Sequence, residues 1–204
     1  INQLDNKKIE YSKLDYMFNN SIISLSDLRG RQGERIINDC LSKLILEDEY
    51  LLTNLLLPLK NGKKTEIDCV LISRKGVFCI EVKNWVGHII GDEQCDYWIQ
   101  KYNDLSIPDK KHRNPFKQNE KHCSRLEKEL DYEYNVFNIV LFTNLEDRSQ
   151  LYSPSTYDID SFINYYKRLP DKLYEEDIES IVDCLVVFEA SEEEINAHKK
   201  TFIH

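Results

Sequence analysis

The chain has 204 residues, of which 41% are hydrophobic and 31% charged, and its formal net charge at pH 7 is −9. This composition predicts a soluble globular protein of one domain, with or without a small extension, and excludes a disordered chain. The apolar stretches fall short of the ~20 residues that span a bilayer, and the first residues lack the basic start of a signal peptide. We therefore expect a cytoplasmic protein with no membrane contact. The acidic charge also excludes a general nucleic-acid coat protein, which would be basic.

The cysteines give no sign of a zinc site or of a disulfide framework. The six thiols include no Cys-x-x-Cys pair, which structural zinc sites commonly use. Several lie within apolar runs, where a free thiol behaves as a small hydrophobe. We expect all of them to be reduced, as is usual in the cytoplasm.

Hydrophobic periodicity predicts the elements of the first half of the chain. A short helix is expected near residues 13–18, and an amphipathic helix over residues 31–46 carries apolar residues at helical spacing. Three strands, separated by glycine-containing turns, follow over residues 50–57, 65–73 and 77–85. Short turns join neighbouring strands as antiparallel pairs, so these three strands predict a meander.

The second half alternates between short strands and helices. We expect, in this order, a small hairpin (88–90 with 97–99), a polar loop (103–113), a helix that starts at Pro115 (115–130), a fourth core strand (136–143), two helices (160–168 and 175–185), an edge strand (186–189) and a helix capped by Ser191. The order predicts an α/β fold with a mixed sheet.

Acidic residues recur where this sheet would place them together. Strand alternation puts Glu81 and Lys83 on one face about 7 Å apart, and a hairpin that closes near Lys75 brings Asp68 opposite or diagonal to Glu81. Glu34 lies at the edge of the apolar stripe of the first long helix and is expected to point inward.

These residue types suit metal-dependent phosphodiester hydrolysis. Carboxylate oxygens bind Mg²⁺ or Mn²⁺, so Asp68 and Glu81 would be direct ligands, while Glu34 would complete the shell or orient a metal-bound water. Lys83 would position the attacking water and stabilise negative charge. A Glu-x-Lys pair is also common on solvated strands. Asp68 is harder to explain as a surface residue, because a carboxylate within so apolar a strand is costly unless it is paired.

A basic stretch follows the hairpin in this otherwise acidic chain. It predicts contacts with the phosphate backbone, although a solvated helix face would have the same composition. The candidate nucleic-acid contacts are Lys110, Lys111, Arg113, Lys117 and Lys121. Gln118 could hold the lysine, a water or a substrate phosphate.

The remaining candidates carry less information. Trp85 and Trp98 could stack on bases, but core packing is the favoured interpretation. The histidines lack metal-ligand spacing, so the sequence assigns no role to His88, His112 or His122. No glycine-rich phosphate loop is present, which argues against an intrinsic ATPase.

Four segments of the chain together match one known pattern: 31–35, 66–72, 76–87 and 114–119. Through these segments, residues 29–145 resemble a nuclease-related domain (NERD). The resemblance implies a restriction-endonuclease-like αβββαβ core of the PD-(D/E)xK superfamily, Mg²⁺-dependent DNA cleavage, catalytic positions at Glu34, Asp68, Glu81 and Lys83, and an accessory position at Gln118. Family members often join this domain to helicase, kinase or zinc modules, and none of these is evident here.

Together these patterns predict an N-terminal extension (1–28), a nuclease-related core (29–148) and a mainly helical C-terminal extension packed on the core (149–204). The expected function is that of a Mg²⁺- or Mn²⁺-dependent deoxyribonuclease in DNA processing or in defence against foreign DNA. The alternative is a non-catalytic module that binds nucleic acid or recruits a partner. For either function, the expected partners are DNA and either another protein or a second copy of the chain.

Overall fold

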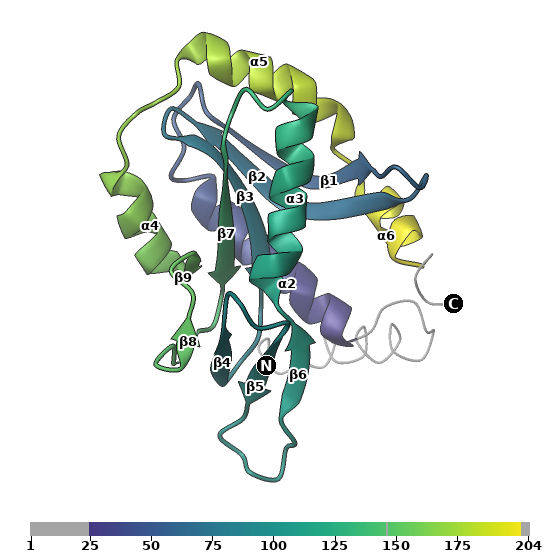
Figure 1. The fold of residues 1–204 in the computed structure, drawn as a ribbon, viewed down its shortest axis with the longest axis vertical. Coiled ribbons are helices and arrows are strands. Elements are labelled where there is room, and N and C mark those ends of the chain that lie inside the picture. The colour runs from purple at the N-terminus through teal and green to yellow at the C-terminus, as the bar shows by residue number, and fades with distance from the viewer. Residues whose placement is uncertain (1–24, 146, 201–204) are drawn as a thin grey trace, which may run out of the picture.

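The computed structural model describes residues 25–145 and 147–200, and places them in a central sheet covered by helices, with a smaller sheet at one end (Figure 1). The short helix expected near residues 13–18 lies outside the described residues. None of the helices in the described ranges is both long enough and apolar enough to cross a bilayer.

The central sheet has five strands, in the spatial order β1, β2, β3, β7, β9. The first three are antiparallel, whereas β7 lies parallel to β3 and β9 lies parallel to β7. This confirms the mixed sheet and its antiparallel meander. The strands are β1 (Tyr50–Pro58), β2 (Lys64–Ser73), β3 (Gly76–Lys83), β7 (Val136–Phe142) and β9 (Thr156–Asp158).

Helices cover both faces of this sheet, which gives three layers. On one face α2 (Leu25–Leu41) and α4 (Ile159–Arg168) pack against β3 and β7 around the fully buried Phe78. On the other face α3 (Pro115–Glu129) and α5 (Glu175–Leu185) cover the meander. Because β3 is buried on both sides, its last residues are held firmly at the end of the sheet.

The smaller sheet has four strands, in the order β6, β5, β4, β8. Its core is the fully buried Trp98, which packs with residues from the end of β7, so the core-packing interpretation of Trp98 is confirmed. The strands are β4 (His88–Asp92), β5 (Tyr97–Lys101), β6 (Lys110–Arg113) and β8 (Leu151–Tyr152). This sheet stands beside the end of β3 that carries Lys83.

Most of the predicted elements are confirmed, and their ends differ in a few places. The helix expected over 31–46 ends at Leu41, because turns follow it and the Glu49 carboxylate accepts a hydrogen bond from the backbone of Leu46 (3.0 Å). The third strand ends at Lys83 rather than at residue 85. The helix at Pro115 begins as predicted, with the side chain of Asn114 as its N-cap.

Three predictions about local structure were wrong. Residues 110–113, expected to belong to a loop, form β6, and the short strands β8 and β9 were missed. Residues Val186–Phe188 form a 3₁₀-helix instead of an edge strand. The last helix, α6 (Glu192–Lys200), does follow Ser191, whose hydroxyl accepts from the backbone of Glu194 (3.3 Å).

Candidate active site

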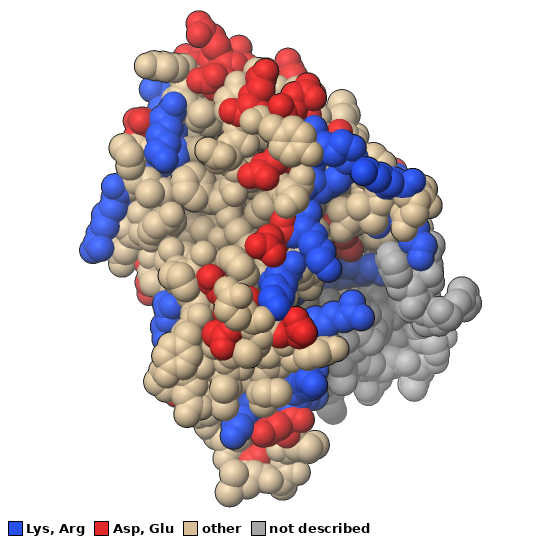
Figure 2. All heavy atoms as spheres, viewed as in Figure 1, with Lys and Arg blue, Asp and Glu red and all other residues tan. Residues whose placement is uncertain are grey.

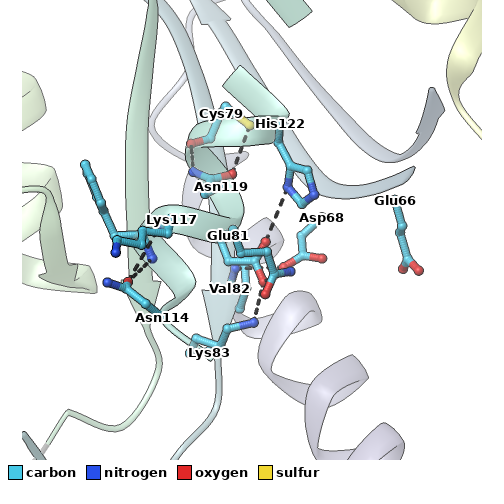
Figure 3. Close-up of polar contacts among 12 residues, drawn as sticks. Glu66, Asp68, Cys79, Glu81, Val82, Lys83, Asn114, Lys117, Asn119 and His122 are labelled. Atoms are coloured by element: carbon cyan, nitrogen blue, oxygen red, sulfur yellow. Dashed lines mark hydrogen bonds and ion pairs between the residues drawn. The ribbon is translucent and has the colours of Figure 1, made fainter. Parts of the chain in front are cut away.

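Two adjacent strands bring the predicted acids together. The β2–β3 register pairs Cys69 with Ile80, which places Asp68 opposite Glu81 at the open end of the hairpin. The backbone N–H of Val82 donates to Asp68 Oδ2 (2.8 Å), and the Lys83 ammonium donates to Glu81 Oε1. Figure 3 shows the side chains of Asp68, Glu81 and Lys83 lying close together.

Glu81 is only 2% exposed, and α3 supplies two further contacts with it. The Gln118 amide donates to Glu81 Oε1 (2.9 Å), and His122 Nδ1 lies 3.5 Å from Glu81 Oε2. On the other side of the ring, His122 Nε2 lies 3.2 Å from the Thr65 hydroxyl. Both carboxylate oxygens of Glu81 therefore face α3 side chains, and the hydrogen bond from Gln118 orients the group.

The position of α3 is set by one fully buried side chain, Asn119 (Figure 3). Its amide nitrogen donates to the carbonyls of Cys79 (2.8 Å) and Ile139 (3.1 Å), and the Cys79 thiol donates to its oxygen (3.1 Å). These bonds tie the helix to both β3 and β7. Because Gln118 precedes Asn119 directly, its reach to Glu81 follows from this anchor.

Glu34 comes from α2, which approaches the end of β3 closely. A Cβ at Gly33 would lie 2.8 Å from Asn84 Cβ, so only glycine allows this approach. Asn84 in turn donates to the Arg29 carbonyl (2.7 Å) and accepts from the Thr143 hydroxyl (2.6 Å). The Gly33-Glu34 pair is thereby placed at the rim of the acidic end of the sheet.

A lysine from the last helix also reaches this rim. Lys199 Nζ lies 2.9 Å from Glu66 Oε1, which is the acid two residues before Asp68 on β2. Glu34 is the next acid along the rim, and burial raises its pKa while Lys199 opposes that rise. The C-terminal helix therefore contributes charge to the same site as the hairpin.

The crowding of carboxylates has electrostatic consequences. Burial raises the pKa of Asp68 well above its ordinary value, and the charge of Glu81 adds to this effect. Burial alone would lower the pKa of Lys83, but the surrounding carboxylates, Glu81 first, leave it above its ordinary value. The site therefore keeps Lys83 charged and favours a further cation beside Asp68.

These residues line an open cleft of about 720 Å³ between the central sheet and the smaller sheet. The far wall includes Trp85 and His112, whose rings stack with centroids 4.1 Å apart, so Trp85 lines the cleft as well as packing on Phe142. Burial lowers the pKa of His112. Among the described residues, the charged side chains of the cleft are four cations and four carboxylates: Arg29, Lys83, Lys110 and Lys199 with Glu34, Glu66, Asp68 and Glu81.

The donor chemistry fits a hard divalent ion. Asp68 and Glu81 offer carboxylate oxygens from opposite positions of one hairpin, which suits Mg²⁺ or Mn²⁺. Within residues 25–145 and 147–200, no group of three His, Cys, Asp or Glu side chains is gathered closely enough to form a complete metal site. An ion held by these two acids would therefore keep several waters, as Mg²⁺ usually does.

The five predicted catalytic residues, Glu34, Asp68, Glu81, Lys83 and Gln118, all line this cleft. The basic segment is divided: Lys110 faces the same cleft, whereas a second hollow takes the side chains of Arg113, Lys117 and Lys121. Lys111 lies over the Tyr97 ring, with Nζ 4.1 Å from the centroid. The roles of these residues stay predictions.

Sequence reasoning missed several residues of the site, among them His122, His112 and Lys199. His122 could have been found, because it lies four residues after Gln118 and therefore on the same face of α3. His112 depends on β6, which was expected to be a loop. No local signal points to Lys199, which enters the site only because α6 folds back onto the sheet.

The architecture, a mixed sheet flanked by helices with acids on its antiparallel hairpin, is consistent with a restriction-endonuclease-like fold. The nuclease-related domain (NERD) family model matches residues 29–143, more than half of the chain, and the chain belongs to this family. The PD-(D/E)xK superfamily is consistent with this membership.

An uncharacterised protein of Bacillus anthracis is 32% identical over 114 residues, which cover 56% of this chain and 52% of that protein. The chain thus spans about half the length of this relative. No solved structure gives a significant match.

Proposed function

We propose that this chain is a Mg²⁺- or Mn²⁺-dependent nuclease that hydrolyses phosphodiester bonds of DNA, in DNA processing or in defence against foreign DNA. The observation that carries the proposal is the arrangement around Glu81. This buried carboxylate lies opposite Asp68, is bonded to Lys83 and Gln118, and opens onto a cleft. The membership of the chain in the nuclease-related domain family supports a nuclease-related function.

Each side chain has a task in this proposal. Asp68 and Glu81 would hold the ion, which when bound lowers the pKa of water and neutralises phosphate charge. The Lys83 ammonium, fixed beside Glu81, would stabilise the negative charge that develops on the phosphate. Gln118 orients Glu81 through its hydrogen bond, His122 lies beside the same carboxylate, and Glu34 lies within reach to orient a water.

The second candidate is a non-catalytic module that binds nucleic acid or recruits a partner. The charge balance of the cleft favours it, because four carboxylates offset four cations and DNA is a polyanion. A metal ion would reverse this balance in the nuclease. A second copy or another protein could supply further DNA affinity in either case.

The test is incubation with supercoiled plasmid and labelled single strands in Mg²⁺, Mn²⁺ or EDTA, beside Lys83→Met. The matched control is Lys128→Met, in the last turn of α3, where the lysine is exposed and lies outside the cleft. Cutting that needs metal and is lost only in Lys83→Met supports the nuclease. A folded wild type that cuts neither substrate in any metal contradicts it and favours the binding module.

A further inference from the structure

A second hollow of about 480 Å³ lies beside the active-site cleft, and Gln118 lines both. Figure 2 shows a band of Lys and Arg side chains that follows α3 toward β6, while acidic side chains gather over α5. The hollow lies between these two basic elements. Its charged and aromatic lining among the described residues is Tyr97, His122, Arg113, Lys117, Lys121 and Asp96.

Strand alternation explains how one basic segment serves two sites. Along β6, Lys110 and His112 point into the active-site cleft, and the next residue, Arg113, lines the second hollow. The β5–β6 register places Tyr97 directly opposite Arg113, so the two side chains share a face. From the other wall, Lys117 and Lys121 are one helical turn apart on α3.

The charge of this hollow differs from that of the active-site cleft. In the part of the chain that the structure describes, three cations face one carboxylate, Asp96, and that carboxylate is already paired with Lys117 (2.8 Å). Among the described residues neither Arg113 nor Lys121 forms an ion pair, so both remain able to bind phosphate. The hollow therefore attracts an anion without a metal ion, which the charge-balanced cleft does not.

The aromatic component has the form of a stacking platform. Tyr97 is 46% exposed, and the Lys111 ammonium covers its ring at 4.1 Å from the centroid. Bases stack on such rings with little dependence on sequence. A hollow of 480 Å³ is in the range of small-ligand pockets. It has room for an unpaired nucleotide, and a base that is stacked inside a duplex has no free face to offer the Tyr97 ring.

We propose that this hollow binds single-stranded nucleotides next to the phosphate held in the active-site cleft, with Arg113 and Lys121 on phosphates and Tyr97 on a base. The inference rests on the proposed nuclease function and narrows its substrate. The preferred DNA has an unpaired segment at the cleavage point, such as an overhang, a flap or a gap.

Binding without turnover tests this inference apart from catalysis. Fluorescence anisotropy in EDTA and low salt would compare a labelled single strand with a blunt duplex of the same length. We expect tighter binding of the single strand. Tyr97→Ala should weaken single-strand binding about fivefold or more, from a stacking contribution of about 1 kcal/mol or more. Tyr97→Phe should retain it, and blunt-duplex binding should be unchanged in both variants.

The salt dependence separates the phosphate contacts from stacking. Arg113→Ala and Lys121→Ala should each lower the slope of log affinity against log salt by about 0.7 for a single strand, whereas Tyr97→Ala should leave the slope unchanged. Lys128→Ala is the matched control and should change neither quantity. Three results would each overturn the inference. They are an equal loss of affinity for duplex and single strand in Tyr97→Ala, no effect of Tyr97→Ala on affinity for the single strand, or no binding of the single strand by the wild type. Absent cleavage with this binding pattern intact would instead count against the nuclease proposal.

Discussion

Replacement of Lys83 by methionine tests the buried ion pair at the centre of the site. The Lys83 side chain is 18% exposed and that of Glu81 only 3%, so the variant leaves a carboxylate buried without its cation. Breaking such a pair costs about 3–5 kcal/mol. The Gln118 hydrogen bond remains, so we expect the lower end, about 3 kcal/mol, or a fall in Tm of about 6–12 °C for a chain of this size.

Urea unfolding in EDTA at pH 7.5 measures this loss. The double variant Glu81→Gln/Lys83→Met removes both charges and should recover at least half of the lost stability, which gives a clear coupling energy in a double-mutant cycle. Lys128→Met, an exposed lysine on α3, should change stability by no more than about 0.5 kcal/mol. If Lys83→Met matches that control, or if the two single effects simply add, Glu81 and Lys83 do not form a coupled buried pair.

Three further predictions concern the acids and the smaller sheet. Because burial raises the pKa of Asp68 above its ordinary value, its stabilising contribution is present in acid and is lost as the pH rises through the folded-state pKa. Asp68→Asn should therefore stabilise the metal-free protein by about 1–2 kcal/mol at pH 7.5. That gain over wild type should shrink toward pH 5, and a gain independent of pH in urea unfolding would contradict it. Mg²⁺ at about 100 times its Kd should stabilise the wild type by about 2.7 kcal/mol in thermal unfolding but leave Asp68→Asn unchanged, and equal shifts would place the ion elsewhere. Gly87→Ala should cost about 2 kcal/mol or more, because φ is +88° and the new Cβ would lie 2.2 Å from the Lys101 carbonyl oxygen; an unaltered Tm would refute this.

The part of the site that rests on local structure was predictable. Asp68, Glu81 and Lys83 lie on one hairpin, so strand alternation and a short turn are enough to bring them together. The helix of Gln118 could also be predicted, because Asn114 and Pro115 mark its start. Glu34 depended on the apolar stripe of α2, and the close approach that Gly33 allows could not be foreseen from that stripe.

The parts of the fold and of the site that were not predicted depend on contacts between distant segments. Residues 110–113 are charged and show no apolar alternation, and they become a strand because they pair with β5. The short strand β9 likewise forms by pairing with β7. Lys199 reaches Glu66 across more than half of the chain. The hydrophobic periodicity of a segment carries no information on such pairings, because they depend on the distant segment with which it pairs.

The most direct test of the account is a crystal structure of the protein with Mn²⁺, whose anomalous scattering locates the ion. The account predicts a peak between Asp68 and Glu81, about 2 Å from an oxygen of each carboxylate, with water in the remaining positions. No peak at these acids in crystals that contain Mn²⁺, or a peak bound only elsewhere, would contradict the claim that this hairpin holds a catalytic metal.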